Sequence, residues 1–168
     1  TGYFVARTDT AYQVQHYKQN LEDDGFTLAE TEELTGKTDT IATANPKTYT
    51  GFTLDRTVEG TVASGNIAGD GSLVLKLYYT RNSYDVTYAY TGTVPTGASA
   101  LPEKATVKYG APVAVAEAAT APGYTFSGWS QKEDFTMPAE NVTITGSFTA
   151  NGDTAYTVEH YQQNLAGD

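Results

Sequence analysis

The stretch DTAYQVQHYKQNL, from Asp9 to Leu21, occurs a second time, almost unchanged, as DTAYTVEHYQQNL from Asp153 to Leu165. The similarity extends to both sides, so that residues 1–24 align without a gap with residues 145–168, and 15 of these 24 positions are identical. Chance does not produce such a match, and self-similarity at a fixed offset is typical of tandem repeats. The chain is therefore predicted to hold one period of 144 residues and the start of the next period.

A weaker self-similarity divides this period in two. AYQVQHY at 11–17 resembles SYDVTYAY at 83–90, and TGFTLD at 50–55 resembles PGYTFSGW at 122–129, with Gly51 and Gly123 offset by 72 positions. We therefore predict two related modules and two partial ones. The predicted boundaries are residues 1–9 for the last strand of a preceding repeat, 10–82 for the first module, 83–153 for the second module, and 154–168 for the first strand of the next repeat.

Composition favours strands and excludes several classes of partner. The chain of 168 residues holds 13 Tyr and many Thr residues, which suit half-buried strands. The net charge of −10 argues against nucleic acid, whose phosphates need basic residues, and against anionic membranes. There is no cysteine, which excludes disulfides and thiolate chemistry. A cysteine-free chain is compatible with the cytosol and is also common among Gram-positive surface proteins.

Local patterns predict a mainly β fold, or a β-rich α+β fold, made of two small modules in an elongated chain. Residues 10–19 and 73–80 alternate apolar and polar positions, and we expect 73–80 to be a well-buried closing strand. Residues 26–36 fit either a strand or an amphipathic helical turn. Residues 114–119, AVAEAA, could form one helical turn. The Asp-Gly pair in residues 68–72 predicts a type I′ hairpin turn.

Two stretches resemble known repeat families of bacterial surface proteins. PGYTFSGW and FTMPAENVTITGSFTAN, between Pro122 and Asn151, resemble the Listeria–Bacteroides repeat, which is also seen as internalin B-repeats. The first module, with YQVQHYKQNLEDDGFTLAETEELTGK and DGSLVLKLYYTRN, is similar to mucin-binding-protein (MucBP) repeats, although more loosely. The resemblance implies an extracellular location on the bacterial cell wall and a compact, often β-grasp-like fold. It implies no catalytic residues and defines no ligand-binding residues in this chain.

Few residues are candidates for site chemistry, and we expect no cofactor, no metal and no catalytic group. His16 and His160 occupy equivalent positions in successive repeats and are predicted to be hydrogen-bonded histidines on a strand face, not zinc ligands. The acidic run Glu22, Asp23 and Asp24 lacks the spacing of a calcium loop and is interpreted as a solvated turn.

Three further features have both a chemical and a structural interpretation. Asn141 begins an Asn-Val-Thr sequon but is expected to be a turn residue. Lys76 lies in an apolar strand and is the one candidate for an intramolecular isopeptide bond. Five tyrosines near the module boundary could form a sugar-binding patch, although core packing is the simpler interpretation. They are Tyr78, Tyr79, Tyr84, Tyr88 and Tyr90.

The expected function is therefore a non-enzymatic spacer in an extracellular adhesin of the bacterial cell surface, where it projects a tip domain from the wall. Short linkers at 80–84 and 150–156 predict a fairly stiff rod. The alternative is direct binding to mucin glycans or to a host surface protein. Other expected partners are adjacent repeats of the same chain and, through the terminal strands 1–9 and 154–168, further copies of this chain.

Overall fold

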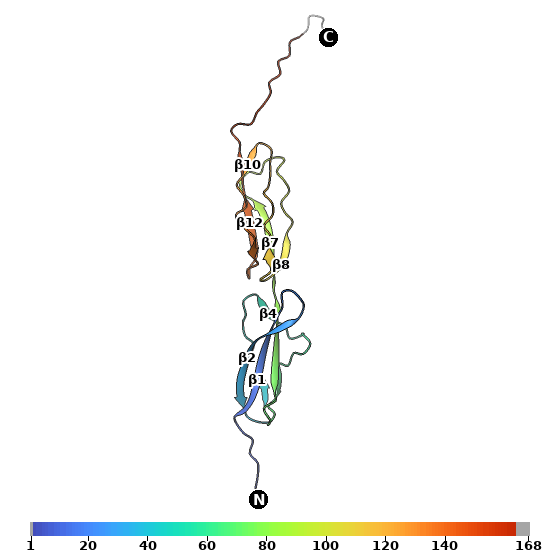
Figure 1. Cartoon of the computed structure of the whole chain (residues 1–168), viewed down its shortest axis with the longest axis vertical. Helices are drawn as coiled ribbons and strands as arrows, with labels where there is room; N and C mark the ends of the chain where they lie inside the picture. The colour runs from blue at the N-terminus through green and yellow to red at the C-terminus, as the bar shows by residue number, and fades with distance from the viewer. Residues whose placement is uncertain (1, 164–168) are drawn as a thin grey trace.

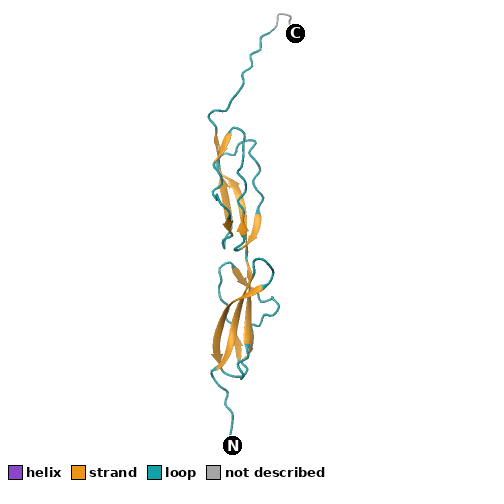
Figure 2. Ribbon diagram, in the orientation of Figure 1, coloured by secondary structure: helices purple, strands orange, loops and turns teal. Residues whose placement is uncertain are grey.

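The computed structural model describes residues 2–163, and within this range the chain is built from thirteen strands and contains no helix. Figures 1 and 2 show two groups of strands that follow one another along the long axis of the molecule. We name them the first lobe, which contains β1–β6, and the second lobe, which contains β7–β13. No helix long and apolar enough to cross a membrane is found among the described residues. The predicted mainly β, elongated fold is confirmed.

The first lobe is organised around a four-stranded mixed sheet with the strand order β2-β1-β6-β4. Its central strands β1 and β6 run parallel, while β2 pairs antiparallel with β1 and β4 antiparallel with β6. Strands β3 and β5 form a separate antiparallel pair. The strands are β1 (Thr10–Gln19), β2 (Phe26–Gly36), β3 (Ile41–Thr43), β4 (Phe52–Leu54), β5 (Ser64–Asn66) and β6 (Val74–Arg81).

The second lobe repeats this plan with shorter strands. In its main sheet, of order β12-β7-β8, the first strand β7 again pairs antiparallel with the next strand of its sheet and parallel with a late strand, β12. Two antiparallel pairs, β10–β13 and β9–β11, complete the lobe. The strands are β7 (Ser83–Tyr90), β8 (Ala105–Lys108), β9 (Pro112–Val113), β10 (Tyr124–Phe126), β11 (Phe135–Thr136), β12 (Val142–Gly146) and β13 (Phe148–Ala150).

Each lobe has its own hydrophobic core. In the first lobe the alternation predicted for residues 73–80 is confirmed, because Leu75, Leu77 and Tyr79 all point inward from β6 and are almost fully buried. Val14 of β1 packs against them. The second core gathers around Trp129, whose ring contacts Tyr88, Tyr90 and Phe126. Its buried members are Val86, Val113, Ala119, Trp129, Met137 and Ile144.

Two local predictions are wrong, and one open alternative is resolved. Residues 114–119 form no helical turn, because side chains take up backbone groups there: Ala116 N–H donates to the Tyr88 hydroxyl and Glu117 C=O accepts from the Trp129 indole. The Asp70–Gly71 pair makes no type I′ hairpin, since Asp70 does not have a positive φ and β5 pairs with β3 instead of β6. Residues 26–36 form strand β2, not a helical turn.

The segments outside the two lobes are extended, exposed and not paired in strands. Residues 2–9 precede β1, and residues 154–163 extend beyond the second lobe, as the two ends of Figure 1 show. Both carry exposed apolar side chains, among them Phe4 and Tyr156. The prediction that they are strands of flanking repeats concerns neighbours that a single chain does not contain, and it stays a prediction. Thr1 and residues 164–168 of these segments lie outside the described residues.

Candidate functional site: the joint between the lobes

A single residue, Asn82, connects the last strand of the first lobe to the first strand of the second. Its N–H donates to Gly51 C=O at 2.9 Å, and its side-chain oxygen accepts from the Thr53 hydroxyl at 2.7 Å. Its own carbonyl accepts from the N–H of Tyr109, in the second lobe, at 2.8 Å. Asn82 is thus hydrogen-bonded to both lobes, and we name this arrangement of its N–H, carbonyl and side chain the asparagine clasp.

Arg81, the residue before the clasp, connects the lobes through its guanidinium group. One terminal nitrogen donates to Tyr109 C=O of the second lobe at 2.8 Å, and the other donates to Gln19 C=O of the first lobe at 3.1 Å. The guanidinium also lies 4.8 Å from the centre of the Phe52 ring. Hydrogen bonds from a charged donor are stronger than neutral ones, and a planar fork holds its acceptors in fixed directions. Arg81 therefore restricts bending between the lobes.

The Tyr109 ring packs against Gly51 and Phe52 at the joint, and Gly51 cannot easily be replaced. Gly51 has a φ of 76°, and a Cβ added there would lie 2.1 Å from the Tyr109 ring. Tyr109 meets Phe52 edge to face at a centroid distance of 5.9 Å. Only glycine combines this backbone conformation with so close an approach. Gly51, Phe52 and Tyr109 thus form the packed part of the joint.

The surface beside the joint is open and mixes charged with apolar side chains. Lys108 and Asp24 approach across it at 3.7 Å, both exposed, and a pair of this kind contributes little to stability. An open depression of about 520 Å³ lies next to Arg81 and Phe52 and is bounded by the turn after β1. Its walls carry both charge signs and give no indication of a particular ligand.

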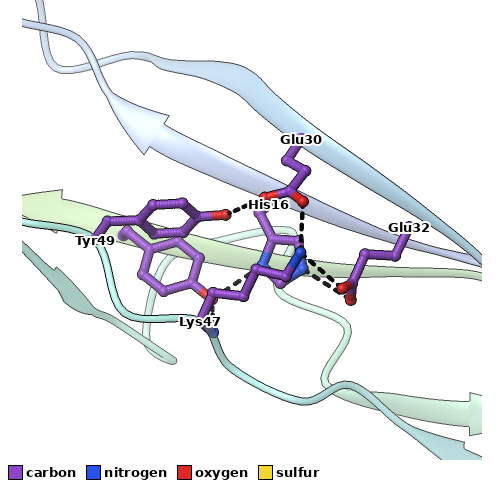
Figure 3. Close-up of polar contacts among 6 residues, drawn as sticks. His16, Glu30, Glu32, Lys47 and Tyr49 are labelled. Carbon is purple, nitrogen blue, oxygen red and sulfur yellow. Dashed lines mark hydrogen bonds and ion pairs between the residues drawn. The ribbon is translucent and has the colours of Figure 1, made fainter.

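A polar cluster within the first lobe accounts for His16, which is fully buried (Figure 3). The Tyr79 hydroxyl accepts from Lys47 N–H at 2.9 Å, so its hydrogen is free to be donated to His16 Nδ1 at 3.0 Å. Nε2–H of His16 then donates to Glu32 at 3.3 Å. Every polar atom of the imidazole has a partner, as a buried polar group requires. The predicted locally hydrogen-bonded strand histidine is observed at this position.

Lys47 holds two carboxylates at the rim of this cluster. Its Nζ lies 2.5 Å from Glu30 and 2.7 Å from Glu32. Figure 3 draws both contacts as dashed lines. These hydrogen bonds lower the pKa of both glutamates and raise the pKa of Lys47. Burial, and then a hydrogen bond to Glu30, raises the pKa of Tyr49 to about 12. The single charge of Lys47 thus offsets one of the two carboxylate charges, and its ammonium group binds both carboxylates.

The other sequence candidates do not converge on one site, although the acidic turn of residues 22–24 borders the joint. Asp23 closes the turn after β1 by accepting from Gly25 N–H at 2.7 Å and from the Asn20 amide at 2.8 Å, which lowers its pKa. Asn141 accepts from Asp85 N–H at 2.9 Å, as expected of a turn residue. Within residues 2–163 no group of three or more potential metal ligands occurs. His160 is exposed on the segment after the second lobe.

Lys76 and the five tyrosines are placed within the lobes. Lys76 is half-buried and exchanges backbone hydrogen bonds with Val62. Both interpretations of Lys76, the isopeptide candidate and the ordinary strand lysine, stay open. The tyrosines form no common exposed patch. Tyr79 is buried in the first core, Tyr78 stacks on Tyr17, and the remaining three pack against the second core. Binding to a mucin glycan or a host protein stays a prediction with no defined surface.

The sequence did not identify the joint residues. Arg81, Asn82 and Tyr109 belong to no site motif, and their roles follow from contacts between lobes that a pattern along the chain does not show. One usable signal was present, because Gly51 and Gly123 recur at the same offset as the modules. A glycine retained between diverged modules indicates a position with a special backbone conformation or a close contact.

One comparison with known proteins concerns the second lobe. Residues 84–155 match the family model described as the Listeria–Bacteroides repeat domain. The second lobe is therefore similar to that repeat family, and the predicted resemblance of the chain to tandem repeats of bacterial surface proteins is confirmed. The likeness of the first lobe to MucBP repeats stays a prediction.

A solved structure titled "Streptococcal High Identity Repeats in Tandem (SHIRT) domains 3-4 from cell surface protein" is 14% identical. The match covers 82% of this chain and 96% of that chain, with a TM-score of 0.29. No curated protein matches the chain.

Proposed function

We propose that this chain is a structural spacer from an extracellular adhesin of a bacterial cell surface, where it projects a tip domain away from the wall and has no enzymatic role. The observation that carries this proposal is the joint. Arg81 and Asn82 hydrogen-bond to both lobes at a linker of one residue. A spacer needs joints that prevent one module from folding back on the next. The hydrogen bonds of Arg81 and Asn82 to both lobes oppose such a motion.

In this proposal the lobes are the repeating modules, residues 10–82 and 83–153. A module of this size buries a limited share of its surface and is only marginally stable alone. Contacts between neighbours, such as Phe52 with Tyr109, add burial that an isolated module lacks. Repetition then adds length without requiring a new fold.

Small-angle scattering of chains with one, two and three 144-residue periods tests this proposal. Compact-domain scaling gives about 30 Å per module, so each added period is expected to lengthen the particle by about 60 Å at constant cross-section. A particle that thickens instead of lengthening would show that the modules collapse on one another and are not a spacer. Arg81→Ala serves as the matched variant and is expected to shorten the mean end-to-end distance without unfolding either lobe.

A further inference from the structure

The far end of the second lobe carries, at Asn151, the N–H and side-chain bonds of a second asparagine clasp. Its N–H donates to Gly123 C=O at 2.8 Å, and its side-chain oxygen accepts from the Thr125 hydroxyl at 2.7 Å. The corresponding distances from Asn82 to Gly51 and Thr53 are 2.9 and 2.7 Å. Gly123 also has a positive φ, of 74°. The same half of the joint is thus built at the end of both lobes.

The entry to the first lobe carries the other half. There the N–H of Thr38, just after β2, donates to Arg7 C=O at 2.9 Å. This matches the bond from Tyr109, just after β8, to Asn82 C=O. Arg7 and Asn151 occupy the same position of the 144-residue period. The bonds of Asn151 to its own lobe therefore correspond to one side of a joint, and the bond from Thr38 to Arg7 corresponds to the other side of the same joint in the preceding period.

We propose that Gly123, Thr125 and Asn151 form the docking site for a following copy of the first module, which begins at Thr154. In this joint Asn151 C=O accepts from the residue that corresponds to Thr38 in the next repeat. The occupant follows from the sequence, since residues 154–163 repeat 10–19 in register. The proposal rests on the proposed function, because it concerns how successive modules are joined.

This second joint lacks the arginine of the first. Arg81 pairs with Phe52 across β6 and β4, and the residue in the corresponding pair of the second lobe is Ala150, opposite Tyr124. In the second joint the position of Tyr109 is taken by the threonine of the next repeat that corresponds to Thr38. Two more residues, 152 and 153, separate the clasp from the next strand, and a Cβ at Gly152 would meet nothing within 4 Å. The array thus alternates a stiff joint with a more compliant one.

Electron paramagnetic resonance distance measurements test both joints in one molecule. The chain is extended by one period, so that residue 153 is followed by a second copy of residues 10–153. It contains no cysteine, so labels can be placed at Thr31→Cys and Ala100→Cys, both exposed positions. Labels on Thr31 and Ala100 of one period report on the joint at Asn82. Labels on Ala100 and on Thr31 of the following copy report on the joint at Asn151.

We expect a single bounded distance distribution at each joint, broader at Asn151 than at Asn82. Asn151→Ala is expected to widen only the second distribution, and Asn82→Ala only the first, which makes each variant the control for the other. A second distribution that does not respond to Asn151→Ala, in a particle still elongated by scattering, overturns this proposal and leaves the spacer function intact. A compact particle overturns the spacer function itself.

Discussion

Replacing Gly51 by alanine tests whether the packed part of the joint is a specific contact. Gly51 has a φ of 76°, and the new methyl group would overlap the Tyr109 ring at 2.1 Å. Gly71 provides a matched control in the same lobe. It also has a φ of 76°, but its nearest neighbour, Ala11 O, lies at an ordinary contact distance of 3.6 Å. The two substitutions share the backbone strain and differ in the overlap.

The expected magnitudes can be separated on this basis. A left-handed backbone conformation costs an alanine roughly 1–2 kcal/mol, which both variants lose. Displacing Tyr109 also breaks its edge-to-face contact with Phe52, which contributes about 0.5–1.5 kcal/mol beyond simple burial. Gly51→Ala is therefore expected to lower the free energy of unfolding of the first lobe by about 1.5–3.5 kcal/mol, against roughly 1–2 kcal/mol for Gly71→Ala.

Urea unfolding measures these losses lobe by lobe. Circular dichroism follows both lobes, and fluorescence of Trp129, the only tryptophan, follows the second lobe alone. A shift of the midpoint at constant slope reports a change in stability. If Gly51→Ala loses no more than Gly71→Ala, Tyr109 moves aside at no cost and the packed joint is not specific. A joint that couples the lobes should also shift the Trp129 transition in Gly51→Ala but not in Gly71→Ala.

Three further predictions concern the first lobe. Leu77→Ala, in a fully buried position, is expected to lower the free energy of unfolding by about 2–5 kcal/mol in urea titrations, with a loss near zero counting against the core assignment. Tyr79→Phe leaves Lys47 N–H and His16 Nδ1 without their partner and is expected to cost about 1–3 kcal/mol, whereas Tyr84→Phe, with one long contact of 3.4 Å, should be nearly neutral. The pKa of Glu30 is lowered in the folded state by its hydrogen bond to Lys47. The contribution of Glu30 to the free energy of unfolding is therefore complete above its ordinary pKa and is lost as pH falls through the lowered value. Lys47→Met should flatten this acid dependence of the midpoint, and an unchanged dependence would show that Lys47 is not its source.

The sequence correctly predicted strands in which apolar and polar side chains alternate. It wrongly predicted secondary structure where distant side chains hydrogen-bond to backbone groups. β6 was found because its apolar residues recur at every second position, and half-buried strands require that spacing. Residues 114–119 have good helix formers, but the Tyr88 hydroxyl and the Trp129 indole take backbone groups that a helix would need. Both partners are distant in sequence, so local propensity could not reveal them.

The residues of the joint could not be predicted from the sequence for a different reason, which lies in the spacing of the two asparagines. The glycines bonded to the two asparagines are 72 positions apart, whereas Asn82 and Asn151 are 69 apart, because the segment from the glycine to the end of the last strand is three residues shorter in the second lobe. A search at one fixed offset therefore aligns the glycines and misses the asparagines. The hydrogen bonds restore the correspondence, since each asparagine takes the same two partners at the same distances within 0.1 Å. The two diverged modules thus retain the same hydrogen bonds at the end of the last strand. An array of repeats needs this constancy because the end of each module is where the next module is joined, whereas the interior contacts only itself.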